Sequence, residues 1–406
     1  GMTHPQPLVM KRGIIHLCKI GILFENRDFE HDVYELIKAF YPEAEIHTLY
    51  ENAEAEYDLR FSVERDNDSY IIKYERTENL SKQETEQKGV ISADILSKEN
   101  AGCGIQDAHA LRKENKDNIK YALYQLLVKL TGRNLPWGNL TGIRPAKLAM
   151  GMIESGMKNT EAAREMRERY LVSPQKTALA ITIANREREI LKDIDYENGY
   201  SLYIGIPFCP SICLYCSFSS YPLKVWEKRT DEYVEALCRE VRETALMMKG
   251  RKLDTIYIGG GTPTTLLPHQ IRKLLDTVGE AFGYEGLAEF TVEAGRPDSI
   301  TREKLMTIRE YPVTRISVNP QTMNQETLDI IGRRHTVEQT KEAFRLAREL
   351  GYDNINMDLI VGLPGEDIHM VERTLEQIRE LAPDSITVHS LAVKRAARLN
   401  IFKEKY

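Results

Sequence analysis

The chain of 406 residues has no apolar run that approaches the roughly 20 residues a membrane-spanning helix needs. It also lacks an N-terminal basic segment followed by an apolar stretch, so we expect no signal peptide and a cytoplasmic location. Its net charge of −6 leaves no positive excess, which argues against nucleic acid as a partner and against attraction to anionic membranes. Six cysteines in so long a chain do not indicate a disulfide framework.

Half of these cysteines lie on one short loop, at Cys209, Cys213 and Cys216, with the spacing C-x3-C-x2-C. The apolar run 203–206 before them predicts a buried strand, which Pro207 ends. Thiolates this close suit an iron–sulfur cluster or zinc, and three ligands are one short of the four that close either site. An open coordination position indicates a catalytic rather than a structural metal site, because it can take a substrate or cofactor. The alternatives are a structural zinc site completed by a distant residue, or three cysteines of the core.

A second unusual loop follows another short apolar run. Residues 256–258 read Ile-Tyr-Ile, and residues 259–264 read Gly-Gly-Gly-Thr-Pro-Thr. Successive glycines allow backbone groups to approach a ligand closely. A glycine run alone is usually only a turn, but one strand followed by thiolates and another followed by glycines favour a shared site.

From residue 201 onward, apolar runs alternate with helical stretches, which predicts parallel βα units. The carboxyl ends of parallel strands then share one open mouth, where ligands bind in βα barrels. The six predicted strands begin near Leu202, Asp254, Ala288, Thr314, Asn354 and Ser385.

The two loops together resemble the radical S-adenosylmethionine (SAM) superfamily. The segments Y-I-G-I-P-F-C at 203–209 and D-L-I-V-G-L-P-G at 358–365 resemble the oxygen-independent coproporphyrinogen III dehydrogenase group. W-G-N-L-T-G-I-R-P at 137–145 and S-L-A-V-K-R-A-A-R-L at 390–399 are similar to its HemZ-type branch. The resemblance implies an α/β fold with a partial (β/α)6 radical SAM barrel, preceded by a smaller N-terminal α+β and helical region.

We expect three regions: an N-terminal α+β domain at 1–100, a helical connecting region at 101–197, and the barrel at 198–406. Members of the family continue with a domain that covers the barrel mouth, so we expect this region to be truncated here. In the first region, residues 57–74 predict a hairpin. For residues 137–145 we favour a buried Trp137 beside a helix that starts near Pro145 over a ligand loop.

The resemblance implies that Cys209, Cys213 and Cys216 hold three irons of a 4Fe–4S cluster and that SAM binds the fourth. An electron from the cluster then splits SAM and releases a 5′-deoxyadenosyl radical. Simpler interpretations exist for some SAM contacts, since Glu293 and Asp358 could cap helices and Arg333 could be a solvated charge. The residues that match family positions beside SAM are Tyr203, Tyr215, Gly261, Thr262, Glu293, Gln321, Arg333, Asp358 and Ala392.

The family's reaction is the oxidative decarboxylation of coproporphyrinogen III propionates to vinyl groups, which gives protoporphyrinogen IX. A porphyrinogen substrate and a low-potential electron donor, flavodoxin or ferredoxin, are thereby implied as partners. The dehydrogenases carry another cysteine where this chain has Phe218, whereas HemW-type haem chaperones carry Phe. The alternatives are therefore such a chaperone, or a radical SAM enzyme with another substrate. On charge alone, the candidates for binding the substrate's carboxylates are Arg144, Lys394, Arg395 and Arg398.

Overall fold

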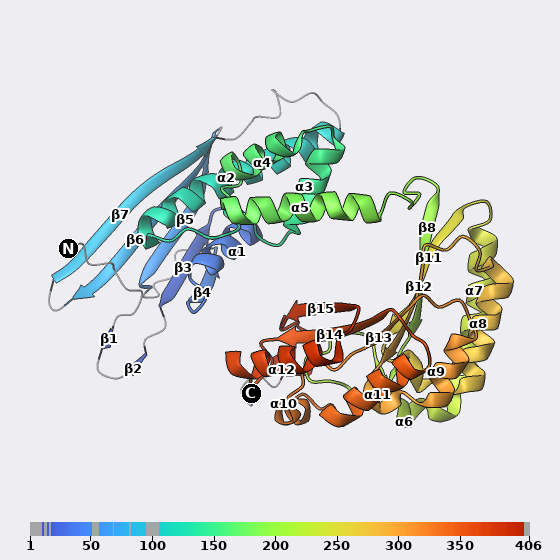
Figure 1. Cartoon of the computed structure of the whole chain (residues 1–406). Coiled ribbons are helices and arrows are strands. Elements are labelled where there is room, and N and C mark those ends of the chain that lie inside the picture. The colour runs from blue at the N-terminus through green and yellow to red at the C-terminus, as the bar shows by residue number, and fades with distance from the viewer. Residues whose placement is uncertain are drawn as a thin grey trace. The chain divides into compact units, whose positions relative to one another are not determined.

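The computed structural model describes residues 10–11, 14–15, 18–50, 57–67, 69–80, 83–94 and 105–401. The chain divides into two compact units, Gly1–Lys192 and Asp193–Tyr406, and most of their elements are labelled in Figure 1. The division into three regions stays a prediction. None of the helices in the described part of the chain is long and apolar enough to cross a membrane.

The N-terminal unit contains a five-stranded sheet with the strand order β4-β3-β5-β6-β7. β3 runs parallel to β4 and β5, and β5, β6 and β7 are antiparallel neighbours. The expected hairpin is the β5–β6 pair, which turns between Asp66 and Ser69. The strands are β3 (Lys19–Phe24), β4 (Glu45–Leu49), β5 (Leu59–Asp66), β6 (Ser69–Leu80) and β7 (Gln83–Asp94), with a separate short pair β1 (Met10–Lys11) and β2 (Ile14–Ile15).

Two helices of this unit, α1 (Glu30–Phe40) and α2 (Ile105–Thr131), share a core with the sheet. Alternate residues of β5, such as Phe61, are buried in one core with Leu36 of α1 and Leu123 of α2. Three further helices form a second small core against which Trp137 packs; this side chain is half-buried and not buried as expected, although a helix does start at Pro145. They are α3 (Pro145–Glu154), α4 (Asn159–Glu168) and α5 (Pro174–Ile190).

The second unit contains a parallel sheet with the order β15-β14-β13-β12-β11-β8, so each strand lies beside its predecessor in the chain. All six strands begin within three residues of the positions expected from the sequence. They are β8 (Gly199–Ile206), β11 (Lys252–Gly260), β12 (Glu289–Gly295), β13 (Arg315–Val318), β14 (Ile355–Val361) and β15 (Ser385–Ser390). The α/β partial barrel predicted from the sequence is confirmed.

Helices cover one face of this curled sheet (Figure 1). Alternate strand residues such as Ile258, Val292 and Met357 are buried among the apolar faces of these helices. The residues between them, such as Ser317 and Asn356, are polar and lie on the opposite face. The long helices are α7 (Thr230–Met247), α8 (Pro268–Phe282), α9 (Arg302–Arg309), α11 (Val337–Glu349) and α12 (Ile368–Leu381).

Short elements occupy the connections at the strand ends. They are β9 (Phe208–Cys209), β10 (Tyr221–Pro222), α6 (Leu223–Trp226), α10 (Gln325–Ile330) and α13 (Arg398–Ile401), with 3-10 turns at Glu227–Arg229, Pro263–Thr265 and Pro297–Ser299. Side-chain caps fix where the following helices start: Thr336 and Gln339 exchange hydrogen bonds at α11, and Asp367 accepts from the N–H of Met370 at α12. These caps therefore fix where the connections after β13 and β14 end and the next long helices begin.

Candidate active site

The cysteine loop follows β8 directly. β8 ends at Ile206, and Cys209 closes the two-residue strand β9. Cys209 and Cys213 are buried, and Cys216 is half-buried. All three thiols therefore stand at the carboxyl end of a strand that lies at the edge of the sheet.

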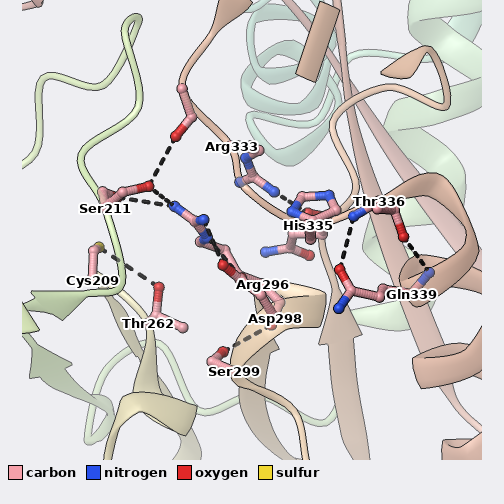
Figure 2. A network of polar contacts seen from close by, with 12 residues as sticks. Cys209, Ser211, Thr262, Arg296, Asp298, Ser299, Arg333, His335, Thr336 and Gln339 are labelled. Carbon is pink, nitrogen blue, oxygen red and sulfur yellow. Dashed lines mark hydrogen bonds and ion pairs between the residues drawn. The ribbon is translucent and has the colours of Figure 1, made fainter. Parts of the chain in front are cut away.

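A buried arginine holds this loop from two strands away. Arg296 follows β12, is 3% exposed, and its Nη1 donates to the carbonyl of Ser211 at 3.0 Å and to Oγ of Ser211 at 2.7 Å. Its Nη2 pairs with Oδ2 of Asp298 at 2.7 Å. Oγ of Ser211 donates onward to the carbonyl of Gly332 at 2.9 Å. The network joins the loops that follow β8 and β12 to the segment after α10, and Figure 2 shows Arg296 between Ser211 and Asp298.

The glycine loop lies against the cysteine loop. The N–H of Gly261 donates to the carbonyl of Ile206 at 2.7 Å, and that of Thr262 donates to the carbonyl of Phe208 at 2.8 Å. A Cβ on Gly261 would stand 2.7 Å from the Phe208 carbonyl and 3.0 Å from Sγ of Cys209. Oγ1 of Thr262 lies 3.6 Å from the same sulfur. Glycine is therefore required where the two loops approach each other.

A second buried arginine, Arg333, lies beside the thiols. It is 6% exposed, donates to the carbonyl of Asn319, and its guanidinium contacts the side chains of Tyr215 and Cys213. Burial lowers the pKa of Arg333, but the neighbouring Tyr215 and Cys213 raise it further, so the guanidinium remains charged. Arg333 is thus not the solvated charge that the simpler interpretation expected.

His335 lies near both arginines (Figure 2). It is fully buried, and within the described part of the chain neither ring nitrogen has a hydrogen-bond partner. Burial, followed by the charge of Arg333, lowers the pKa of His335 to about 3. The imidazole is therefore neutral and adds no third positive charge beside Arg296 and Arg333.

A carboxyl group with a raised pKa lies on the polar face of the sheet. The hydroxyl of Tyr257 donates to Oε1 of Glu293, and the ring of Tyr203 stacks on Tyr257 with centroids 5.8 Å apart. Burial raises the pKa of Glu293 to about 7; the Tyr257 hydrogen bond opposes this shift and the charge of Asp358 adds to it. A cationic ligand here would favour the ionised form. Among the helix starts that the structure describes, none is capped by Glu293 or Asp358.

Gln321 has a strained backbone conformation, and its side-chain oxygen has no hydrogen-bond donor in the part of the chain that the structure describes. Its φ of 70° lies in the left-handed region, and its backbone exchanges hydrogen bonds of 2.9 Å with Asp358 and Ile360 of β14. Oε1 of Gln321 and Oδ1 of Asn319 are buried without a hydrogen-bond partner among the described residues. Both oxygens thus retain the capacity to accept from a ligand.

The residues present fit a 4Fe–4S cluster and SAM. Thiolates are the usual ligands of iron–sulfur clusters. Burial, reinforced by neighbouring cysteine thiols, raises the pKa of Cys209 and Cys216, so their ionised forms need a cationic partner such as iron. No group of three His, Cys, Asp or Glu in the described stretches converges on one metal ion, but in a cluster each thiolate binds its own iron.

The predicted SAM contacts fall into two groups, and their roles stay predictions. One group lies at the cysteine loop and the other on the polar face. The first comprises Tyr215, Gly261, Thr262 and Arg333, and the second comprises Tyr203, Glu293, Gln321 and Asp358. Ala392 is exposed just after β15, and its side chain joins neither group.

Sequence reasoning missed Arg296, Asn319 and Tyr257. Arg296 and Asn319 directly follow β12 and β13, so a search for polar residues after every strand would have found them. Tyr257 is the register partner of Tyr203 on the neighbouring strand. Period-two alternation places both tyrosines on the same face, which was the available signal.

Comparison with known proteins finds a relative that matches most of this chain and relatives that match about half of it. Residues 203–378 match the Radical SAM superfamily. The chain is 38% identical to the oxygen-independent coproporphyrinogen-III oxidase-like protein HemZ of Bacillus subtilis over 343 residues, which are 81% of this chain and 68% of HemZ. It is 39% identical to the haem chaperone HemW of Bacillus subtilis over 195 residues, which are 48% of this chain and 51% of HemW.

Among solved structures, the coproporphyrinogen III oxidase HemN of Escherichia coli matches with a TM-score of 0.46 and 30% identity, over 54% of each chain. This chain therefore spans about two thirds of HemZ and about half of HemW and HemN.

Proposed function

Because the chain belongs to the radical SAM superfamily, among the oxidoreductases of the coproporphyrinogen oxidase-like group that includes HemZ, we propose that it converts coproporphyrinogen III to protoporphyrinogen IX. One observation carries this choice. The similarity to HemZ extends over 343 residues, more than the unit Asp193–Tyr406 contains, whereas the similarity to HemW extends over 195 residues. The similarity to HemZ therefore extends into the N-terminal unit, and this favours a HemZ-like activity over that of a haem chaperone.

In this reaction, each of two propionates loses a hydrogen atom, an electron and CO2, and becomes a vinyl group. Cys209, Cys213 and Cys216 would each hold one iron of the 4Fe–4S cluster. The bound cluster and SAM would supply the one-electron chemistry that removes the hydrogen atom. A low-potential flavodoxin or ferredoxin would provide the electrons, and the reducing cytoplasm is the compartment we propose.

The chain's own residues would position these groups. The Arg296–Ser211 hydrogen bonds fix the loop that carries the thiols. Glu293, held by Tyr257, would receive a cationic part of SAM, and Gln321 would accept a hydrogen bond through its unpartnered Oε1. The remaining SAM contacts that we propose are Tyr203, Tyr215, Gly261, Thr262, Arg333, Asp358 and Ala392.

The test is an anaerobic turnover assay with the full chain, reconstituted iron–sulfur cluster, SAM, reductant and coproporphyrinogen III. We expect protoporphyrinogen IX and two molecules of CO2 for each substrate, and no product from Cys213→Ala. Cleavage of SAM without any porphyrin product would contradict the proposed substrate.

A haem chaperone is the second candidate, and Phe218 favours it. This residue stands where the dehydrogenases carry cysteine, and its side chain is 75% exposed beside the cluster loop. Binding of one haem per chain, with no turnover of coproporphyrinogen in the same preparation, would support the chaperone over the dehydrogenase.

A further inference from the structure

An open hollow lies against the cysteine loop. One wall is Ser211 and Ile212, which stand between the first two cysteines of the motif. The other wall is made by arginines from two distant segments: Arg333 and Arg334 after α10, and Arg398 of α13. We call this feature the arginine hollow.

The arginine hollow is positive in a protein whose net charge is −6. Among the described residues that line it, Asp329 is the only acid. Arg334 and Arg398 are exposed, and neither forms an ion pair with another described residue. Like charges gathered without partners repel one another, so an external anionic surface would be favoured here.

The wall of the hollow is rigidly connected to the thiols. Ser211 receives two hydrogen bonds from buried Arg296 and donates one to the carbonyl of Gly332, next to Arg333 (Figure 2). The N–H of Leu214 donates to the carbonyl of Ile331 at 2.9 Å. A molecule seated in the hollow would therefore stand at a fixed, short distance from the cysteine loop, and electron transfer is fastest over short distances.

We propose that the arginine hollow is the docking surface for an acidic one-electron carrier protein of the flavodoxin kind. This inference depends on the proposed radical SAM chemistry, which needs electrons from outside the chain. Charge complementarity identifies the occupant, because an acidic carrier would be steered to the positive patch next to the cluster ligands. The hollow is open to solvent, which suits a protein surface better than an enclosed small molecule.

The test measures binding of a purified acidic flavodoxin to the full, reconstituted chain at low and high ionic strength. Arg334→Glu should weaken binding about tenfold at low salt, and the difference should shrink at high salt because screening weakens the charge contacts. The matched control is Arg251→Glu, which makes the same charge change on an exposed arginine before β11, at the opposite end of the strands. It should leave the affinity unchanged.

A second measurement separates docking from chemistry. With dithionite as reductant, Arg334→Glu should cleave SAM at the wild-type rate, whereas reduction of the cluster by flavodoxin should slow about tenfold. Wild-type affinity for flavodoxin in Arg334→Glu, or an equal loss in Arg251→Glu, would overturn the proposal. So would displacement of flavodoxin by coproporphyrin, because the hollow would then be a site for substrate carboxylates.

Neither measurement contains porphyrinogen, so the two proposals can fail separately. Suppose that Arg334→Glu selectively loses flavodoxin binding and that the wild type does not turn over coproporphyrinogen. The proposed docking surface would then stand, and only the proposed substrate would be wrong. Normal turnover of coproporphyrinogen with a chemical reductant, without any binding of flavodoxin, would support the proposed substrate and contradict the proposed docking surface.

Discussion

Nη1 of Arg296 lies 2.7 Å from Oγ of Ser211, across 85 residues of sequence. This contact ties the end of β12 to the loop that carries the three thiols. Arg296 is almost fully buried and also pairs with Asp298, so its loss would leave the Asp298 carboxylate and the Ser211 carbonyl without this partner.

Arg296→Ala should therefore lower the free energy of unfolding by about 2 kcal/mol, measured in urea, because it removes the charge-assisted hydrogen bonds of a buried guanidinium. The same variant should take up less iron on reconstitution. The control Arg302→Ala breaks an exposed pair with Glu349, which should cost less than about 1 kcal/mol. Equal losses of unfolding free energy in the two variants would contradict the proposal that Arg296 holds the cysteine loop.

Cys213→Ala should lose most of the roughly four irons that reconstituted protein holds, because each thiolate is one of only three protein ligands. The matched control is Cys238→Ala, which changes a buried cysteine of α7 in the same unit. Iron analysis and the visible absorption of the cluster measure the outcome. A comparable loss from Cys238→Ala would show that the ligands are wrongly chosen.

Gly261→Ala should destabilise the cysteine loop by about 1–3 kcal/mol and reduce iron uptake, since the new methyl group would overlap the Phe208 carbonyl. Gly205→Ala is the control on β8, where the nearest atom would stand 3.5 Å away. Gly260 is less informative, because its φ of 105° strains any other residue. Full iron content with weaker SAM binding in Gly261→Ala would instead indicate a direct ligand contact.

Glu293→Gln should change stability in a pH-dependent way. Burial raises the pKa of Glu293 from 4.5 to about 7, so the folded state takes up a proton between these values and the wild type loses stability as pH rises through them. The variant should therefore gain on the order of 2 kcal/mol over wild type at pH 8 and little at pH 5. Urea unfolding at both pH values measures this.

Glu310→Gln provides the contrasting control. The hydrogen bond from Arg272 lowers the pKa of Glu310, so its contribution to stability is present at neutral pH and is lost as pH falls. Any difference between this variant and wild type should therefore diminish toward acid pH. The same pH trend in both variants would refute the assigned environment of Glu293.

A fragment comprising residues 193–406 should bind the cluster and cleave SAM without substrate. Every residue predicted to bind the cluster or SAM lies at or after residue 203, and the unit has its own core. The fragment should start at Asp193, because Asp195 accepts from the N–H groups of Glu197 and Asn198 where β8 begins. A folded fragment with a full cluster but no SAM cleavage would make the N-terminal unit part of the active site.

The sequence predicted the barrel because its evidence is local. Each strand is a short apolar run followed by a helical stretch, and both special loops directly follow such runs, so Cys209 and Gly261 could be placed at the same end of the sheet. The hairpin between β5 and β6 was equally local.

What could not be predicted depends on contacts between distant residues. Nothing near Arg296 in the chain indicates Ser211, because the loops that carry them follow β12 and β8, which are separated by β11. Nothing near Tyr257 indicates Glu293, because only the register of β11 and β12 brings them together. The glycines were expected to admit a ligand, but their position against Phe208 and Cys209 depends on how two loops fold onto each other. The roles of the SAM contacts stay predictions for the same reason.

The order of the strands in the sheet also bears on how the unit can form during translation. Because each strand pairs with the one synthesised before it, the sheet can grow from β8 as the chain leaves the ribosome. The cysteine loop is synthesised near the start of this process, yet Leu214 accepts its hydrogen bond from the N–H of Leu399, which is synthesised near the end. The contacts of this loop with the glycine loop and with Arg296 can therefore form early, and the hydrogen bond from Leu399 is added only when nearly the whole barrel has been synthesised.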